Sequence, residues 1–270
     1  MGVGNEIYKG YNYDDVISNH PYIEGDLHIY PIRLYELKAF NQYTQYIVLS
    51  KKHYGIGRKD SFLNTIISYK IKDICPNFEE LDNESKFSVF GTITKDICGL
   101  FSMVSHEPIT YTYDENKGHC FGNEENSYMI TDKNFNHIRK IILRQNLLLE
   151  PKIYEDELVK EWEEKAMKAR NKNSSLNFCE MKNIVRCGLG ISYEEVDQLN
   201  ICQFKFDFYR LCNNRDALAL DILRTTYGID TKKLPDIKYT DSVLSLLLKD
   251  PSEELWKEQS STNIGKAMGL

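Results

Sequence analysis

Residues 187–228, CGLGISYEEVDQLNICQFKFDFYRLCNNRDALALDILRTTYG, carry the clearest helix signals in the 270-residue chain. Gly188 and Gly190 are expected to end one helix, and Ser192 followed by two glutamates predicts the start of a short one. Asn200 is expected to cap a longer helix, because the apolar residues after it recur at helical spacing. These residues are Ile201, Phe204, Phe208, Leu211 and Cys212.

The same stretch contains a predicted break. Asn213 and Asn214 interrupt the apolar stripe, so a third helix is expected over residues 215–227, with Gly228 in the position of a C-terminal cap. Successive helices of this kind are typical of a helical bundle, and they name no activity.

Upstream of this stretch, helical and strand-like patterns alternate. The spacing of apolar residues predicts helices over residues 33–52, 62–75, 87–105, 132–150 and 154–172. Asp60 or Ser61 is expected to cap the second of them and Asp132 the fourth. The last is strongly charged, and its narrow apolar stripe consists of Leu158, Trp162, Ala166 and Ala169.

Three segments have the β-branched and aromatic character of strands, at residues 109–113, 119–122 and 127–131. They predict a small antiparallel sheet, which a hairpin over residues 22–30 could join. The chain is therefore expected to have a mainly α (α+β) fold, with a multi-helix domain and a small antiparallel β-sheet insertion.

The polar segment 171–177 is the best candidate for a linker. It predicts a helical domain with the small sheet over residues 1–170 and a C-terminal helical bundle over residues 171–258. Residues 259–270 are small and polar, so they are expected to form a loose tail.

Composition excludes several classes of protein. The chain has 34 Lys and Arg against 40 Asp and Glu, a net charge of −6, which argues against a general nucleic-acid binder. Its seven cysteines form no C-x-x-C pair, as is typical of a reducing compartment. No apolar signal-peptide core opens the sequence, and no run is expected to reach the length that spans a bilayer. An intracellular protein without membrane contacts is expected.

The common motifs of catalysis are missing from the sequence, including a P-loop, paired Cys/His metal spacing and a nucleophile elbow. Gly-Ile-Gly at residues 55–57 is interpreted as a helix break and not as a phosphate loop. His119 and Cys120 are interpreted as turn or strand residues and not as metal ligands. We assign no catalytic, cofactor-binding or metal-binding residue and expect no cofactor, although an enzyme site assembled from dispersed residues would leave no motif.

The pattern GISYEEVDQLNICQF at residues 190–204 resembles the small helical tail assembly chaperones of phages that infect Gram-positive bacteria. YPI at 30–32, LSKKH at 49–53 and LEPKI at 149–153 are similar to uncharacterised tail-module proteins of such phages. The resemblance covers residues 130–230. This chain is longer than the typical chaperone and carries a β-element. Because of these differences, a component of the virion is an alternative to a transient chaperone.

The resemblance implies a non-enzymatic role in the host cytoplasm. Such a chaperone binds the tape-measure protein through apolar helical surfaces and helps to recruit tail-tube subunits. The alternatives are a permanent component of the phage tail or baseplate, located in the virion, and an enzyme with a dispersed site. The partners are expected to be phage tail proteins, and an oligomer is possible.

The C-terminus supplies a candidate partner contact. Apolar residues in this otherwise polar region are expected to dock on a partner protein. They are Leu255, Trp256, Ile264 and Met268.

Overall fold

The computed structural model describes residues 12–57, 59–123, 128–171 and 176–227 of the chain. The chain divides into two units. The N-terminal unit contains residues 10–151 together with 200–202, and the described part of the C-terminal unit contains residues 152–199 and 203–227. The domain boundary predicted at residues 170–171 falls inside the C-terminal unit, and the predicted tail lies outside the described residues.

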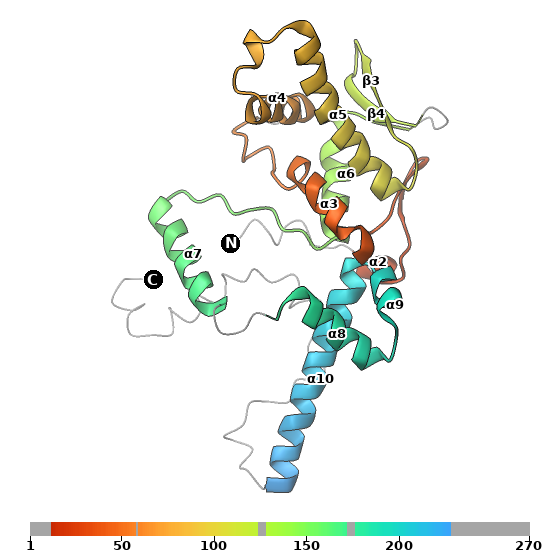
Figure 1. Ribbon diagram of the computed structural model, residues 1–270, viewed down its shortest axis with the longest axis vertical. Helices are drawn as coiled ribbons and strands as arrows, with labels where there is room; N and C mark the ends of the chain where they lie inside the picture. Colours follow the sequence, from red (N-terminus) through yellow and green to blue (C-terminus); the bar gives the residue numbers. More distant parts are fainter. Residues whose placement is uncertain (1–11, 58, 124–127, 172–175, 228–270) are drawn as a thin grey trace. The chain divides into compact units, whose positions relative to one another are not determined.

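The N-terminal unit is built mainly of helices (Figure 1). Its short helical elements are α2 (Tyr13–Ile17), α3 (Leu37–Tyr43) and the 3₁₀ turns η1 (Leu34–Glu36), η2 (Thr44–Tyr46) and η3 (Phe78–Glu80), the last of which follows the first of the long helices. The long helices are α4 (Phe62–Ile74), α5 (Asn83–Ser105) and α6 (Asp132–Gln145).

Edge-to-face aromatic contacts join the three long helices. The Phe62 ring of α4 lies 5.4 Å from the Phe135 ring of α6, which lies 6.2 Å from the Phe101 ring of α5. All three side chains are at most 1% exposed. Aromatic pairs in this geometry stabilise a core beyond the area that they bury.

Two separate antiparallel sheets accompany the helices. Strands β1 (Tyr22–Glu24) and β2 (Leu27–Ile29) form a hairpin, and β3 (Thr110–Asp114), β4 (Gly118–Gly122) and β5 (Met129–Ile130) form a three-stranded sheet in that order. The hairpin does not join the larger sheet, so that suggested extension is wrong. The mainly α (α+β) fold is confirmed.

The single helix predicted over residues 33–52 is wrong beyond Tyr46. In a continuing helix the carbonyl of Val48 would accept from the amide of residue 52. Here it accepts instead from Nη2 of Arg139, at 3.1 Å. The chain therefore leaves the helix in turns, although the predicted start near residue 33 is confirmed.

Helix α5 corrects the expectation about membrane-length segments. It has 23 residues and a mean hydropathy of 1.3 over its most apolar window, enough to cross a bilayer by length and composition alone. Core helices of soluble proteins satisfy the same criterion. The second half of α5 buries Ile97, Leu100 and Phe101 within the N-terminal unit, so the finding is weak evidence for a membrane span.

The C-terminal unit contains α7 (Glu157–Asn171), α8 (Phe178–Leu189), α9 (Tyr193–Gln198) and most of α10 (Ile201–Tyr227). Ser192 caps α9 as expected, through a hydrogen bond from the amide of Glu195. Gly190 adopts a left-handed φ of 69° after α8, where glycine is favoured. Gly188 does not end the helix: it lies inside α8.

A further expectation about this stretch is wrong. The chain does not break at Asn213 and Asn214, because α10 continues for 27 residues through both of them. Asparagine disfavours a helix by only a fraction of a kcal/mol, and the following residues are good helix formers. Helix α10 begins at Ile201, directly after Asn200, as predicted. The Asn200 side chain also donates to the carbonyl of Val16 at 2.7 Å, a distant partner that the sequence pattern does not reveal.

The apolar stripe predicted along α7 is also partly wrong. Leu158 is 74% exposed, whereas Glu163 of the same helix is only 4% exposed. The Glu163 carboxylate accepts from the Tyr154 hydroxyl at 2.7 Å and pairs with Lys152 at 3.4 Å. These partners satisfy the buried charge, and sequence spacing alone ranks Leu158 above Glu163 for burial.

Candidate functional site

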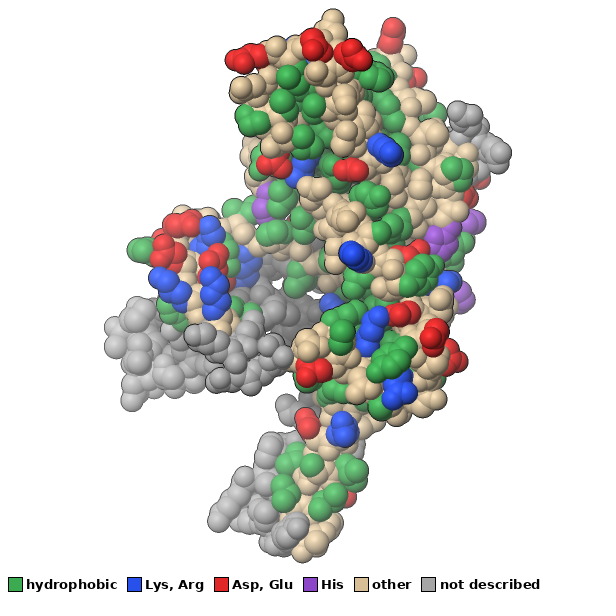
Figure 2. Space-filling model, viewed as in Figure 1, with side chains coloured by type: hydrophobic (Ala, Val, Ile, Leu, Met, Phe, Trp, Pro, Cys, Tyr) green, Lys and Arg blue, Asp and Glu red, His purple; other side chains and the backbone are tan. Residues whose placement is uncertain are grey.

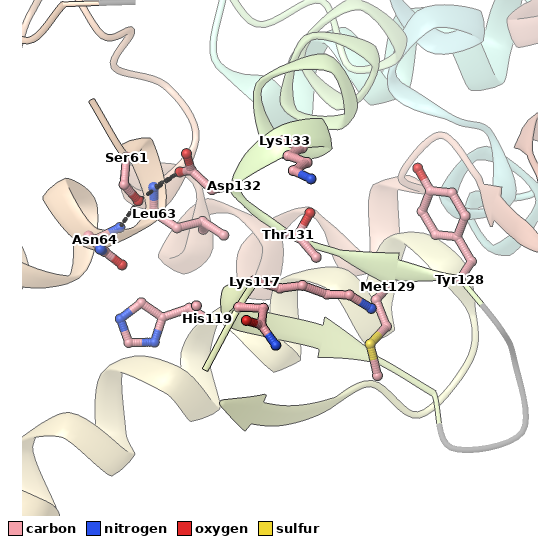
Figure 3. Close-up of a pocket in the computed structure, with 12 residues that line it drawn as sticks. Ser61, Leu63, Asn64, Lys117, His119, Tyr128, Met129, Thr131, Asp132 and Lys133 are labelled. Atoms are coloured by element: carbon pink, nitrogen blue, oxygen red, sulfur yellow. Dashed lines mark hydrogen bonds between the residues drawn. The ribbon is translucent and has the colours of Figure 1, made fainter. Parts of the chain in front are cut away.

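A cavity of about 550 Å³ opens in the N-terminal unit where three segments meet (Figure 3). One wall is the start of α4, the second is the turn between β3 and β4, and the third is β5 with the start of α6. The segments are far apart in sequence, so no local motif marks the cavity. Its lining residues are Ser61, Leu63, Asn64, Asn116, Lys117, Gly118, His119, Tyr128, Met129, Thr131, Asp132 and Lys133.

Hydrogen bonds to the Asp132 carboxylate join the first wall of the cavity to the third. Its Oδ1 accepts from the Ser61 hydroxyl and from the Leu63 amide, both at 2.9 Å. Ser61 Oγ in turn accepts from the Asn64 amide, so Ser61 caps α4 as expected. Asp132 was expected to cap its own helix, but Thr131 occupies that position. The carboxylate serves α4 instead, where an acid stabilises the helix start.

The hairpin turn places a lysine over the cavity. Asp114 Oδ1 accepts from the amides of Asn116 and Lys117, and these hydrogen bonds lower the pKa of the Asp114 carboxyl. Figure 3 shows the Lys117 side chain extending across the cavity, with Lys133 on the α6 side. Within the described part of the chain, neither ammonium group forms an ion pair.

His119 contributes a neutral ring to the same wall. Its Nδ1 lies 2.8 Å from the Tyr111 hydroxyl. Burial lowers the pKa of the His119 imidazole, so the ring is uncharged at neutral pH. The neighbouring Cys120 is fully buried in β4, on the opposite face from His119. The interpretation of these two residues as strand residues is therefore confirmed.

The cavity offers positive charge without an assembled nucleophile. The Ser61 hydroxyl donates directly to Asp132, which holds it as a helix cap. Tyr128 donates to Glu24 at 2.9 Å, and burial together with this bond raises the pKa of the phenol to about 12. The arrangement suits electrostatic attraction of an anionic group to the two lysines more than proton transfer.

The described residues contain no group of three His, Cys, Asp or Glu side chains that could hold a metal ion. At residues 55–57, the Gly57 amide donates to the Asp60 carboxylate at 2.7 Å. A side chain of the protein thus occupies the donor that a phosphate would need.

The C-terminal unit offers a different feature, an apolar helix face. Leu211, Leu218 and Ile222 lie on one face of α10 because seven and four residues are about two turns and one turn of helix. Gly188 of α8 packs on Leu211, since a Cβ at residue 188 would lie 2.5 Å from Leu211 Cδ1. Further along α10, Leu218 is 58% and Ile222 46% exposed.

Other apolar side chains of α8 to α10 are also exposed (Figure 2). An ion pair between Lys182 and Asp197 and the stacking of Arg186 on Tyr193, at 4.9 Å, hold α8 to α9. We call the exposed set the apolar helix surface. It consists of Phe178, Leu189, Tyr193, Leu218 and Ile222.

The four residues predicted to contact a partner lie outside the described residues. They are Leu255, Trp256, Ile264 and Met268. Sequence reasoning did not single out Lys117 or Lys133, because only the fold brings them together. Leu218 and Ile222 carried a visible signal, their helical spacing from Leu211.

Comparison with known proteins yields one relative. No family model matches the chain, and no solved structure does. The chain is similar to the SPbeta prophage-derived uncharacterized protein YomV of Bacillus subtilis (strain 168), with 22% identity over 119 residues. That alignment covers 44% of this chain and 48% of YomV, so it spans about half of the relative's length. The similarity associates the chain with phages.

Proposed function

We propose that this chain is a non-enzymatic phage tail assembly protein that binds tape-measure or tail-tube proteins in the host cytoplasm. The observation that carries the proposal is the apolar helix surface, with Leu218 58% and Ile222 46% exposed on one face of α10. The similarity to a prophage-derived protein supports a phage context.

The physical argument rests on what such a surface can bind. Exposed apolar side chains gathered on helices favour binding of an amphipathic partner helix. Burying one leucine or isoleucine contributes about 1.5–3 kcal/mol. A tape-measure protein consists of long helical segments whose apolar faces need protection before the tail tube forms around them. A permanent tail or baseplate component is the alternative role for the same surface.

The test is co-purification of the full-length tagged chain with co-expressed tape-measure or tail-tube protein. The variant pair Leu218→Ser and Ile222→Ser removes two apolar groups from the face of α10. We expect the affinity to fall about tenfold or more, because burial of both side chains is lost. Thermal melting should change little, since both side chains are exposed.

Leu158→Ser is the matched control, because Leu158 is 74% exposed on α7 and lies outside the apolar helix surface. It should leave binding unchanged. Equal binding by the double variant and the control would contradict the proposal for this surface.

The C-terminal residues Leu255, Trp256, Ile264 and Met268 are proposed as a second contact with the same partner. Deleting residues 252–270 should weaken capture of that partner. Capture that is unaffected by the deletion would remove this contact from the proposal and leave the one on α10 in place.

A further inference from the structure

A second cavity in the N-terminal unit, of about 450 Å³, lies beside α2 and β1 and ends on Gln145. We infer that it is a binding site for a primary alkylammonium group, such as the side chain of a lysine. The cavity shares no residue with the one at the start of α4. Its lining residues are Asn12, Asp15, His20, Pro21, Tyr22, Ile23 and Gln145.

The first argument is an acceptor without a donor. Gln145 is 1% exposed, and its Nε2 donates to the carbonyl of Ile29 at 2.9 Å. Because a carbonyl can only accept, this bond fixes which end of the amide is nitrogen. The other end, Oε1, is buried and has no hydrogen-bond partner among the residues that the structure describes. A buried acceptor of this kind is unfavourable until a donor reaches it.

The next residue shows that the fold can satisfy a buried amide completely. Asn146 is also 1% exposed, and its Oδ1 accepts from the Ile32 amide at 2.9 Å. Its Nδ2 donates to the Ile142 carbonyl at 2.8 Å. The two adjacent buried amides therefore differ in whether the side-chain oxygen accepts a hydrogen bond. The acceptor that has no donor belongs to the residue that lines the cavity.

The second argument is the chemistry of the walls. Asp15 supplies a carboxylate whose side chain is 64% exposed, and Pro21, Tyr22 and Ile23 supply apolar surface. A lining that combines an unpaired acceptor, an acid and apolar side chains matches an ammonium group on an alkyl stem. Basic groups also lie near: His20 is 3.8 Å from Asp15, and Arg144 acts electrostatically on Tyr22. Binding should therefore be of modest affinity.

The test uses n-butylamine, which mimics the lysine side chain, and the ¹⁵N-labelled full-length chain. Titration at neutral pH should give a saturable shift of the Gln145 side-chain amide resonance in NMR spectra. Butyrate and n-butanol, which lack the ammonium group, should leave that resonance in place. A Gln145 amide that does not move with butylamine would overturn the inference.

Variants distinguish the contribution of the buried Gln145 acceptor from that of the Asp15 charge. Gln145→Met removes the buried acceptor and should weaken butylamine binding, followed by the backbone amide resonances of the cavity residues, about tenfold or more. Asp15→Asn removes only a partly exposed charge and should weaken it about two- to fivefold. Asp14→Asn is the matched control, because Asp14 is an exposed acid of the same helix outside the cavity. Equal effects of Asp14→Asn and Asp15→Asn, with unchanged binding in Gln145→Met, would refute the site.

Two further probes identify the source of the ammonium group. A lysine-containing peptide that binds more tightly than cadaverine would assign the site to a lysine of a partner protein. The reverse order would assign it to a free polyamine. Weak binding of both probes, no tighter than that of butanol, would count against an ammonium site of either kind.

Discussion

Different kinds of interaction stabilise the interior of each of the two units. In the N-terminal unit, hydrogen bonds join residues that are far apart in sequence: Arg139 donates to the Val48 carbonyl, and the Ile32 amide donates to Asn146. In the C-terminal unit, α8 and α9 begin with capping boxes that span three residues, at Asn177 and at Ser192. The first arrangement fixes a closed core. The second defines helices locally and leaves apolar side chains exposed for contact with another protein.

The largest expected effect comes from breaking the buried ion pair of the N-terminal unit. Glu150 Oε1 lies 2.6 Å from Arg139 Nη2, and the two side chains are 5% and 0% exposed. Burial lowers the pKa of Arg139, while Glu150 opposes that shift. Glu150→Ala would leave a buried charge uncompensated, and we expect the free energy of unfolding to fall by about 3–5 kcal/mol.

Urea unfolding followed by circular dichroism measures this change. Glu161→Ala is the control, because Glu161 forms an exposed i,i+4 pair with Lys165 on α7. Its effect should stay below about 0.5 kcal/mol. Similar losses for the two variants would contradict the difference between the units.

The next effect compares one glycine from each unit. In α8, a methyl group at Gly188 would meet Leu211, so Gly188→Ala should destabilise by about 1–3 kcal/mol through overpacking. In α5, no atom of the described residues lies within 4 Å of a Cβ at Gly91. Gly91→Ala should therefore stabilise by about 0.5–1 kcal/mol, the usual gain in helix propensity. Thermal melting of the two variants should shift in opposite directions. A shift in the same direction would contradict the packing of α8 on α10.

A smaller effect concerns pH. Burial lowers the pKa of the His119 imidazole below its ordinary value of 6.5, so the folded protein binds this proton less readily than the unfolded chain does. The contribution of the neutral ring is complete above pH 6.5 and is lost as the pH falls below it. His119→Gln should flatten this part of the pH dependence of unfolding between pH 7.5 and 5. An unchanged slope would show that other groups cause it.

The smallest effect tests the continuity of α10. Asn214 is exposed in the middle of the helix. Asn214→Ala should raise the free energy of unfolding by about half a kcal/mol, because alanine is the better helix former. A loss of stability would indicate that Asn214 belongs to a turn, as the sequence had suggested.

The sequence predicts those parts of the structure that depend on neighbouring residues. The caps at Ser61 and Ser192, the strands around residues 110–122 and the mainly α class are all of this kind. It does not predict Asp132 as a partner for the start of α4, or the end of the helix near Tyr46. Both depend on bonds between residues at least 69 positions apart, Asp132 to Leu63 and Arg139 to Val48.

The candidate sites follow the same division. The apolar helix surface extends a spacing that is visible in the sequence, from Leu211 to Leu218 and Ile222. Neither cavity has such a signal, because each is lined by segments that are far apart in the sequence. Lys117 and Lys133, or Asp15 and Gln145, become neighbours only when the core closes.

The most direct test of the proposed role is quantitative mass spectrometry of density-purified phage particles and of the soluble fraction of the same lysate. A tail assembly chaperone should be confined to the soluble fraction, in complexes with tape-measure or tail-tube protein. Peptides of this chain at a fixed ratio to tube protein in intact particles would contradict that role and identify a virion component. Its absence from both particles and tail-protein complexes would contradict a part in tail assembly altogether.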